Sequence, residues 1–412
     1  MTRKPVLTIF YQFNPWQSSI GGIQSVICSF IKYAPNNFQI RLVGTGSTDS
    51  AIGKWEEKEY AGTSLQFMPV IKIEDDDVRR LIPTSVRYTQ ALLGKDLSSD
   101  FIHFHRIEPT LSTLKWQGNK TLFIHNDIQQ QISADSNKKA ILWKYFPWAY
   151  FALENTVIKQ FSNIFVCNTK ALDFYRQKYA WFANNINYLK NAVDDQMFFP
   201  PTLTEKQEQR KEYAFKRNLS ADTQFVLFAG RLHPQKDPIL LVRSFAALNN
   251  SKYHLLIAGV GDLTNEVRVE IDSLGLSQQI TMLGAVERQE LSKLYRISSA
   301  FILTSVYEGL PIAVLEALAC GTPVVTTKAG ETPNFLTLNS GTVTKDRTPE
   351  AIALELEKIL QNPQDYPIDA CVKVARPYAA KTIIKDVYDQ MWQEWELSNS
   401  NLPVTRSAEN LH

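Results

Sequence analysis

The sequence predicts an α/β protein with two doubly wound domains, each built on a mostly parallel sheet between layers of helices. Short β-branched runs alternate with longer helical patterns along the chain, which is the order of such a sheet. Most of these runs are apolar throughout, as expected of strands that are covered on both faces. With 412 residues the chain is too long for one ordinary core and fits two domains of similar size.

Ten segments are predicted to be strands. In chain order they are 6–11, 38–44, 100–105, 120–125, 163–168, 225–230, 253–259, 280–284, 300–305 and 322–327. Most of them continue into Gly, Ser, His or Asn and then into a helical pattern. Because ligands of such sheets bind beyond the carboxyl ends of the strands, the residues after each strand are the candidate site residues.

A change of composition marks the predicted domain boundary. Residues 201–223 are rich in Lys, Arg, Glu and Gln and precede a new strand, so we expect a linker with a short surface helix there. This division gives an N-terminal domain over 1–200 and a C-terminal domain over 224–381. Residues 382–397 are predicted to form a helix with one apolar face. The tail over 398–412 is polar and aperiodic, which predicts disorder.

Composition excludes several classes of protein. The chain has 44 basic and 42 acidic residues, so its formal charge of +2 gives no strong field for nucleic acid. Its four cysteines have no metal-type spacing and are expected to be reduced and mostly buried, which suits the cytoplasm. The start of the chain has no signal-peptide pattern, and no apolar run reaches the length of a membrane span.

Two carboxylates lie eight residues apart in the segment 305–325, SVYEGLPIAVLEALACGTPVV. Glu308 is in a turn after a buried strand, and Glu316 is two turns into the apolar helix that follows. Pro311 suits the first helical position, and Gly321 suits the end of the helix.

The start of this helix is predicted to bind an anion. The backbone N–H groups of residues 309–313 lack partners within the helix, and the positive end of the helix dipole lies beside them. A diphosphate is a natural occupant of such a site. Glu308 would then lie near a sugar hydroxyl, and Glu316 near the two hydroxyls of a ribose. The alternative is that Glu308 only caps the helix and Glu316 faces solvent.

Two cations follow the strand in FVLFAGRLHPQKDP, residues 225–238. Arg231 and Lys236 lie at a carboxyl edge, where they suit a diphosphate whose charge grows as its bond to a sugar breaks. They would stabilise this leaving group without a metal. The alternative is a surface loop with two solvated cations.

These motifs resemble those of a known family. EGLPIAVLE is similar to the E-x7-E motif of retaining GT-B glycosyltransferases, in particular family 4 (glycosyl transferases group 1), and the second segment is similar to their G-R-L-x-x-x-K-D motif. The resemblance is strongest over 224–346. It implies a GT-B fold, with two Rossmann-like domains facing across a cleft and a C-terminal helix that crosses back to the N-terminal domain.

The resemblance also implies roles for individual residues. Glu308 would contact the donor sugar and Glu316 the ribose, while Arg231 and Lys236 would bind the donor β-phosphate. The remaining donor-site residues that we expect are Gly309, Leu310, Gly21, Gly22, Gly261 and Val286.

The glycine-rich segments have simpler alternatives. Gly21 and Gly22 let the backbone approach a ligand at the start of a helix, or they form a flexible turn. Gly259 and Gly261 begin a dinucleotide fingerprint that lacks its third glycine, so a turn is the plainer interpretation. The resemblance places Gly261 and Val286 near the nucleotide base.

Two histidine sites also match the family. His103 and His105 alternate along one strand and would face the same side; they suggest zinc, but no third ligand has suitable spacing. His125 ends the next strand. A core or surface role is common for any histidine, but the resemblance places His125 first, and His105 second, near donor and acceptor.

Three other segments have open interpretations. NAVDDQMFFP, residues 191–200, resembles a family segment at the domain hinge, although Ala192 replaces a glycine that suits a left-handed turn. The acids at 74–77 form either the first turn of a helix or a metal site. Residues 138–154 are aromatic with three lysines and belong either to the core or to a membrane interface.

The resemblance implies a retaining, metal-independent hexosyltransferase that uses a nucleoside-diphosphate sugar and no further cofactor. Its expected catalytic residues are Glu308, Lys236, Arg231 and His125. The expected acceptor is a glycan or lipid-linked glycan of cell-surface or exopolysaccharide synthesis, at the inner face of the membrane. Three alternatives are a sugar-nucleotide epimerase, a non-catalytic sugar-nucleotide binding protein, and a NAD-dependent dehydrogenase, whose glycine fingerprint is absent. The base, the sugar and the acceptor stay open.

Overall fold

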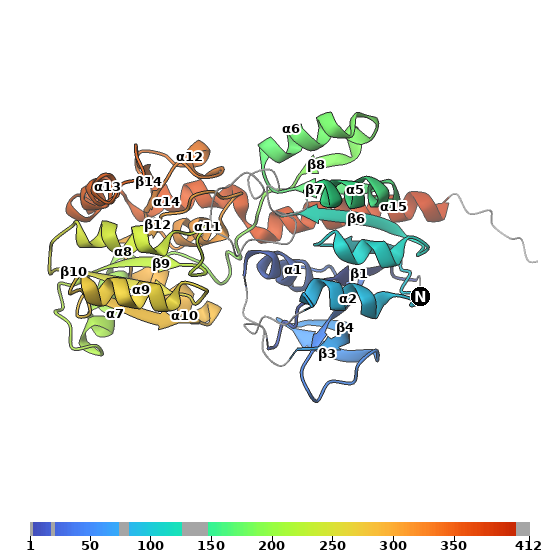
Figure 1. The fold of residues 1–412 in the computed structure, drawn as a ribbon, viewed down its shortest axis with the longest axis horizontal. Helices are drawn as coiled ribbons and strands as arrows, with labels where there is room; N and C mark the ends of the chain where they lie inside the picture. Colours follow the sequence, from blue (N-terminus) through green and yellow to red (C-terminus); the bar gives the residue numbers. More distant parts are fainter. Residues whose placement is uncertain (1–2, 18–20, 74–81, 126–146, 401–412) are drawn as a thin grey trace, which may run out of the picture.

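The computed structural model describes residues 3–17, 21–73, 82–125 and 147–400, and these form two α/β domains (Figure 1). Each domain has one sheet with helices on both faces, which confirms the predicted fold class. The N-terminal sheet has eight strands in the order β3-β4-β2-β1-β5-β6-β7-β8. Its strands are β1 (Val6–Phe10), β2 (Gln39–Gly46), β3 (Glu56–Tyr60), β4 (Thr63–Lys72), β5 (Phe101–Phe104), β6 (Asn119–Ile124), β7 (Asn163–Val166) and β8 (Ile186–Tyr188).

Helices cover both faces of this sheet, with one apolar cluster on each face. The helices are α1 (Gly22–Lys32), α2 (Thr84–Leu92), α5 (Pro147–Val157) and α6 (Thr169–Lys178), with short 3-10 helices η1 (Glu108–Thr113), η2 (Ile158–Gln160) and η3 (Ala180–Asn185). Strand β3 pairs antiparallel with β4, whereas the other neighbours are parallel. Strand β3 has the sequence EEKEY, and its charges suit an exposed edge.

The C-terminal sheet has six strands, all paired parallel, in the order β11-β10-β9-β12-β13-β14. They are β9 (Gln224–Ala229), β10 (Tyr253–Ala258), β11 (Ile280–Gly284), β12 (Ala300–Leu303), β13 (Val324–Thr326) and β14 (Gly341–Val343). The helices are α7 (Leu203–Phe215), α8 (Pro238–Ala246), α9 (Thr264–Ser273), α10 (Arg288–Ile297), α11 (Ile312–Ala319), α12 (Thr332–Phe335), α13 (Pro349–Gln361) and α14 (Ile368–Ala375), with 3-10 helices η4 (Pro363–Asp365) and η5 (Arg376–Tyr378). Strands β9 and β10 are buried along nearly their whole length, as their apolar sequences require.

The surface helix predicted for residues 201–223 is present, but the segment is not a linker between the domains. Residues 201–223 contain the 13-residue helix α7, which begins with a capping box of Thr202 and Glu205. Tyr213 and Ala214 of α7 pack against the C-terminal core, so this segment is part of the C-terminal domain. Its polar composition suggested a linker because only one narrow face of the helix is apolar.

The chain crosses between the domains at two adjacent places. Val193 forms a parallel bridge with Ala379: the Val193 N–H donates to Tyr378 O at 2.8 Å, and the Ala380 N–H donates to Val193 O at 2.8 Å. The final helix, α15 (Ala380–Ser400), starts at this point and runs along the N-terminal domain (Figure 1). The Tyr388 hydroxyl of α15 donates to Phe30 O at 2.7 Å in the N-terminal core.

Two further expectations concern the state of the cysteines and the presence of membrane-spanning segments. All four cysteines are buried and free. Within the described ranges, no helix combines the length and the apolar character needed to cross a bilayer.

Candidate active site

Helix α11 follows β12 after a turn that contains Glu308. The helix begins at Ile312, one residue later than predicted, because Pro311 is its N-cap with an extended backbone (φ −71°, ψ 118°). At the other end, Cys320 is the C-cap and Gly321 takes the left-handed φ of +72°. The Val314 N–H donates to the N-cap carbonyl of Pro311 at 3.1 Å. The N–H groups before it in the first turn have no carbonyl four residues earlier within the helix, so this end of α11 can bind an anion.

The structure brings Glu308 and Lys236 together. The Glu308 carboxylate is buried, accepts the Ser305 hydroxyl at 2.5 Å, and forms an ion pair with the Lys236 ammonium. The loop that presents Lys236 is fixed to the segment after β12, since the Thr304 hydroxyl donates to Lys236 O at 2.9 Å. The interpretation of Glu308 as a mere helix cap is therefore wrong, because its partner is a cation from another loop.

The two glycines after β10 shape the loop that carries Arg231. A Cβ on Gly261 would lie 2.4 Å from Leu232 O, and one on Gly259 would lie 1.9 Å from Gly230 O. The two loops are joined by a hydrogen bond from the Leu232 N–H to Val260 O at 3.0 Å. Close backbone packing thus explains these glycines, and a contact of Gly261 with the donor stays a prediction.

Arg231 and Val286 lie at the carboxyl edge of the C-terminal sheet. Arg231 is exposed, in the same loop as Lys236. Val286 is partly buried against the C-terminal core, two residues after Gly284, whose carbonyl accepts the Gly259 N–H at 2.7 Å. Their roles toward phosphate and base stay predictions.

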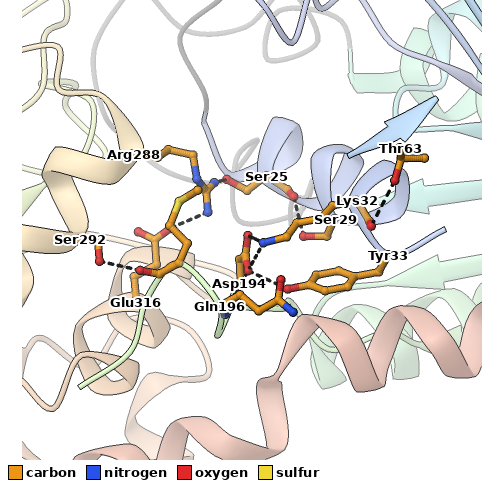
Figure 2. Close-up of polar contacts among 11 residues, drawn as sticks. Ser25, Ser29, Lys32, Tyr33, Thr63, Asp194, Gln196, Arg288, Ser292 and Glu316 are labelled. Atoms are coloured by element: carbon orange, nitrogen blue, oxygen red, sulfur yellow. Dashed lines mark hydrogen bonds and ion pairs between the residues drawn. The ribbon is translucent and has the colours of Figure 1, made fainter. Parts of the chain in front are cut away.

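The Glu316 carboxylate does not face solvent, so that alternative is wrong. It is buried on α11, and one of its oxygens lies 3.4 Å from the Arg288 guanidinium (Figure 2). Its other oxygen lies 3.3 Å from the Tyr295 hydroxyl. Burial raises the pKa of Glu316 to about 7; Arg288 and then Tyr295 oppose this rise, and Asp194 adds to it. A buried carboxylate with two long polar contacts has acceptor capacity left for a ligand.

Residues of the N-terminal domain surround the start of α11. A Cβ on Gly22 would lie 3.8 Å from Ile312 Cδ1, so the start of α1 faces the start of α11. A Cβ on Gly309 would lie 3.4 Å from Cys167 Sγ and 3.6 Å from His125 O. The Asn191 side chain donates to Leu310 O at 2.6 Å. Of the residues predicted for the donor site, Gly22, Gly309 and Leu310 thus lie where the two domains meet.

The two predicted histidines form a pair. His105 Nδ1 and His125 Nε2 lie 2.8 Å apart, so one ring donates and the other accepts. Burial lowers the pKa of His125 to about 4, with a further contribution from Arg106, and burial holds the pKa of His105 well below its usual value. Both are therefore neutral at pH 7. His105 is buried, so it acts through His125 rather than on a ligand directly.

His103 is buried in the N-terminal core and does not belong to a group of metal-binding side chains in the described residues. Burial lowers its pKa to about 3, and its ring packs on Phe30 and Phe123. No group of three or more His, Cys, Asp or Glu side chains suited to a metal occurs in the part of the chain that the structure describes. The zinc interpretation of His103 and His105 therefore has no third ligand there.

Sequence reasoning missed three contributors to this region. Gly330 has a φ of +67°, and a Cβ there would lie 2.2 Å from Gly309 O, so the loop before α12 packs directly on the candidate site. Asn191 was noted only as part of a hinge, because the three-residue strand β8 that precedes it was not predicted. Arg288 had no pattern that distinguished it. Ala192 has no positive φ, which agrees with the expectation that alanine in place of glycine disfavours a left-handed turn there.

Two predicted segments fall partly or wholly outside the described residues. The acids at 74–77 do, as do residues 138–146 of the aromatic segment. In the described part of α5, Tyr150 and Glu154 are buried, which fits the core interpretation, whereas Trp148 is 72% exposed.

Comparison with known proteins finds similarity to glycosyltransferases, mainly over the C-terminal domain. The family model of glycosyl transferases group 1 matches residues 209–373, from α7 to α14. The chain is 31% identical over 182 residues to an uncharacterized glycosyltransferase of Methanocaldococcus jannaschii, a match that covers 43% of this chain and 44% of that protein. It is 28% identical over 211 residues to the D-inositol 3-phosphate glycosyltransferase of Segniliparus rotundus, covering 49% and 45%. The chain thus matches less than half the length of these relatives.

Solved structures share the whole architecture. Sucrose-phosphate synthase of Thermosynechococcus elongatus superposes with a TM-score of 0.75 at 14% identity, covering 96% of this chain and all of that one. Anabaena HepE in complex with UDP-glucose superposes with a TM-score of 0.68 at 16% identity, covering 94% and all of that chain. The chain therefore has the GT-B fold, and its residues 209–373 match the model of the glycosyl transferases group 1 family.

Proposed function

We propose that this protein is a retaining, metal-independent glycosyltransferase that moves a hexose from a nucleoside-diphosphate sugar to an acceptor hydroxyl. The observation that carries the proposal is the Lys236–Glu308 ion pair beside the start of α11, with Glu316 on the same helix. The UDP and UDP-glucose complexes of HepE support a sugar nucleotide as donor for a chain of this fold.

The diphosphate is the group for which Lys236 and Arg231 are suited. Lys236 is paired with Glu308, so a diphosphate at the first turn of α11 would draw its ammonium away. Glu308 is then left to accept a hydroxyl of the donor sugar. One event thus prepares both the leaving-group site and the sugar site.

The reaction proposed is a same-face substitution. The bond between the sugar C1 and the diphosphate oxygen breaks, and the electron pair goes to the diphosphate, which Arg231, Lys236 and the α11 amides stabilise. The acceptor oxygen bonds C1 on that face, and its proton passes to the departing phosphate oxygen. These cations and amides offset the diphosphate charge, which is why we propose that no metal is needed.

His125 is proposed as a hydrogen-bonding residue on the acceptor side. Its ring is neutral at pH 7 and is oriented by His105 at 2.8 Å, and its carbonyl accepts the Cys167 thiol at 2.8 Å. A fixed neutral imidazole can donate or accept a hydrogen bond with a sugar hydroxyl without changing its charge.

We further propose a glycan or lipid-linked acceptor and contact with a membrane surface. Trp148 and Trp181 are 72% and 62% exposed in the N-terminal domain, which is the acceptor-side domain of our proposal. Aromatic side chains of this kind suit the headgroup region. Flotation with anionic vesicles tests the contact: the wild type should float, and W148A/W181A should stay at the bottom of the gradient. No flotation of either protein contradicts it.

Transfer and hydrolysis assays with a panel of UDP, GDP and ADP sugars, with and without EDTA, test the function. Lys236→Ala and Glu308→Gln should each lower kcat by about 10²–10³-fold, because each removes a charged contact at the reacting centre. Lys358→Ala is the matched control, since Lys358 pairs with Glu355 on the surface of α13.

The products separate the alternatives. Epimerised sugar nucleotide without any acceptor would indicate an epimerase, and binding without turnover would indicate a binding protein. Proton NMR should show an α-linked product from an α-linked donor. A β-linked product contradicts retention.

A further inference from the structure

Arg288 links three segments at the domain boundary. It is the first residue of α10, and its guanidinium donates to the Ser25 hydroxyl on α1 and lies 3.4 Å from Glu316 on α11 (Figure 2). Its third neighbour is Phe198, whose ring centre is 5.1 Å away in the segment that follows the domain crossing. The planar guanidinium fork suits this position, because it can serve two partners at once while stacking on a ring.

On the C-terminal side, Arg288 favours the ionised form of Glu316 and partly offsets the effect of burial on its pKa. Four described groups face that carboxylate: Arg288 and Tyr295 from α10, Asp194 from the domain crossing, and Cys320 at the end of α11. Of the two that favour the ionised form, Arg288 has the larger effect, and Asp194 disfavours that form. A ribose diol favours the ionised carboxylate, because that form is acceptor-only and both of its charged oxygens accept strong hydrogen bonds, whereas the protonated form turns one oxygen into an O–H donor.

On the N-terminal side, Arg288 reaches the first half of α1. Ser25 is buried, and its carbonyl accepts the Ser29 hydroxyl at 2.9 Å, so it is a fixed partner rather than a mobile surface serine. The far end of α1 is held separately, since Lys32 and Tyr33 donate to Asp194 (Figure 2). Helix α1 is therefore tied near its start to α10 of the C-terminal domain and at its far end to the domain crossing.

We propose that Arg288 is a positioning residue of the donor site, which aims the Glu316 carboxylate at the ribose hydroxyls and, through Ser25, makes that aim depend on α1 lying against α10. This inference rests on the proposed function and adds a residue to it. It explains why a buried carboxylate and a buried serine from different domains share one guanidinium.

Calorimetric binding of a ribonucleoside diphosphate and its 2′,3′-dideoxy form tests the proposal. The ratio of the two Kd values measures how much the site gains from the ribose hydroxyls. Wild type should prefer the ribo form by about 10-fold or more, since hydrogen bonds to a charged group are involved. Arg288→Gln should reduce the ratio to about 3 or less at pH 7, and Arg288→Lys should keep more of it.

The pH dependence separates positioning from a merely structural role. Without Arg288, Glu316 ionises only at higher pH, so the ratio in Arg288→Gln should recover as the pH rises from 6.5 to 8.5. Ser25→Ala, a small change that spares the charge, should lower the ratio by about 2- to 3-fold at every pH. Arg296→Gln is the matched control, because Arg296 is on the same helix and stacks on Phe199 at 4.6 Å.

If Arg288→Gln keeps the wild-type ratio at every pH, the role of Arg288 is overturned; if Ser25→Ala leaves the ratio unchanged, the inter-domain part is overturned. Should Arg288→Gln not fold, Ser25→Ala and Arg288→Lys carry the test. If wild type binds none of the ribonucleoside diphosphates, the proposed function itself fails, which is a distinct result.

Discussion

The buried carboxylate of Glu316 lowers the stability of the fold and at the same time provides acceptors for a ligand. It lies in the apolar helix α11 with two polar contacts longer than 3.2 Å, and its pKa is raised to about 7. A group whose folded pKa exceeds its unfolded value contributes stability at low pH and loses it as the pH rises through the folded pKa. Ionised Glu316 therefore destabilises the fold. A carboxylate at this position is explained by ligand binding rather than by a contribution to stability.

We expect Glu316→Gln to gain stability over wild type mainly at high pH. The pKa of Glu316 rises from 4.5 to about 7, so the advantage of the variant should grow by about 2–3 kcal/mol between pH 4.5 and pH 8. Urea unfolding of both proteins at these two values measures it. Glu290→Gln, at an exposed position of α10, is the control, and an advantage that stays constant with pH contradicts the account.

Residue roles were predictable only where a local pattern carried them. Glu308 and Lys236 were found because each lies in a recognisable motif, and the structure pairs them across 72 residues. Arg288 escaped prediction because its partner Ser25 is 263 residues away in the chain, and nothing in its own neighbourhood marks it. Likewise, the sequence did not show that His105 would be buried behind His125.

At the scale of elements, the loop before α12 packs directly against the turn that contains Glu308. Gly330 has a φ of +67° and lies against the backbone of Gly309 and Glu308. The loop is fixed further by Glu331, whose carboxylate accepts the N–H and hydroxyl of Thr169 in the N-terminal domain at 3.0 and 2.8 Å. The loop thus determines where Glu308 can lie.

Gly330→Ala should cost more than its backbone strain alone. Its Cβ would lie 2.2 Å from Gly309 O, whereas a Cβ on Gly275, also at φ +67°, would have no other atom within 4 Å, which makes Gly275→Ala the matched control. The control should lose about 1 kcal/mol from strain, and Gly330→Ala about 2–4 kcal/mol together with a raised KM for the donor. Equal losses in urea unfolding, with unchanged KM, would show that the loop does not position Glu308.

The sequence predicted most elements because their patterns are strong. All ten predicted strands are present, whereas β3, β4, β8 and β14 were missed. Strand β3 is charged, and β8 and β14 have only three residues each, so none of them shows a hydrophobic pattern long enough to predict a strand. Helix α7 was assigned to a linker because polar composition does not reveal which domain a helix packs on.

At the scale of the whole molecule, the site is built by both domains around one hinge. The two crossings of the chain pair at Val193 and Ala379, and α15 continues from there along the N-terminal domain (Figure 1). Asp194, next to the crossing, accepts Lys32 at 2.7 Å and Tyr33 at 2.7 Å. This buried cluster ties α1 to the hinge, so the position of α1 is coupled to the domain arrangement.

Asp194→Asn should weaken this tie. The change leaves Lys32 partly buried without its anion, so we expect a loss of about 2–4 kcal/mol in unfolding free energy and a weaker donor affinity. Asp195→Asn, at the exposed neighbouring position, should change the unfolding free energy by less than about 0.5 kcal/mol. Urea unfolding measures the change in stability, and calorimetry measures the donor affinity. If the two variants have equal effects, Asp194 does not couple α1 to the hinge.

A crystal structure of the protein with a bound nucleoside diphosphate tests the central claim most directly. The account predicts the diphosphate at the first-turn amides of α11 with Arg231 and Lys236 on it, the Lys236–Glu308 ion pair opened, and the ribose hydroxyls on Glu316. A nucleotide bound elsewhere, with Lys236 still on Glu308 and Glu316 without a ribose contact, would contradict it.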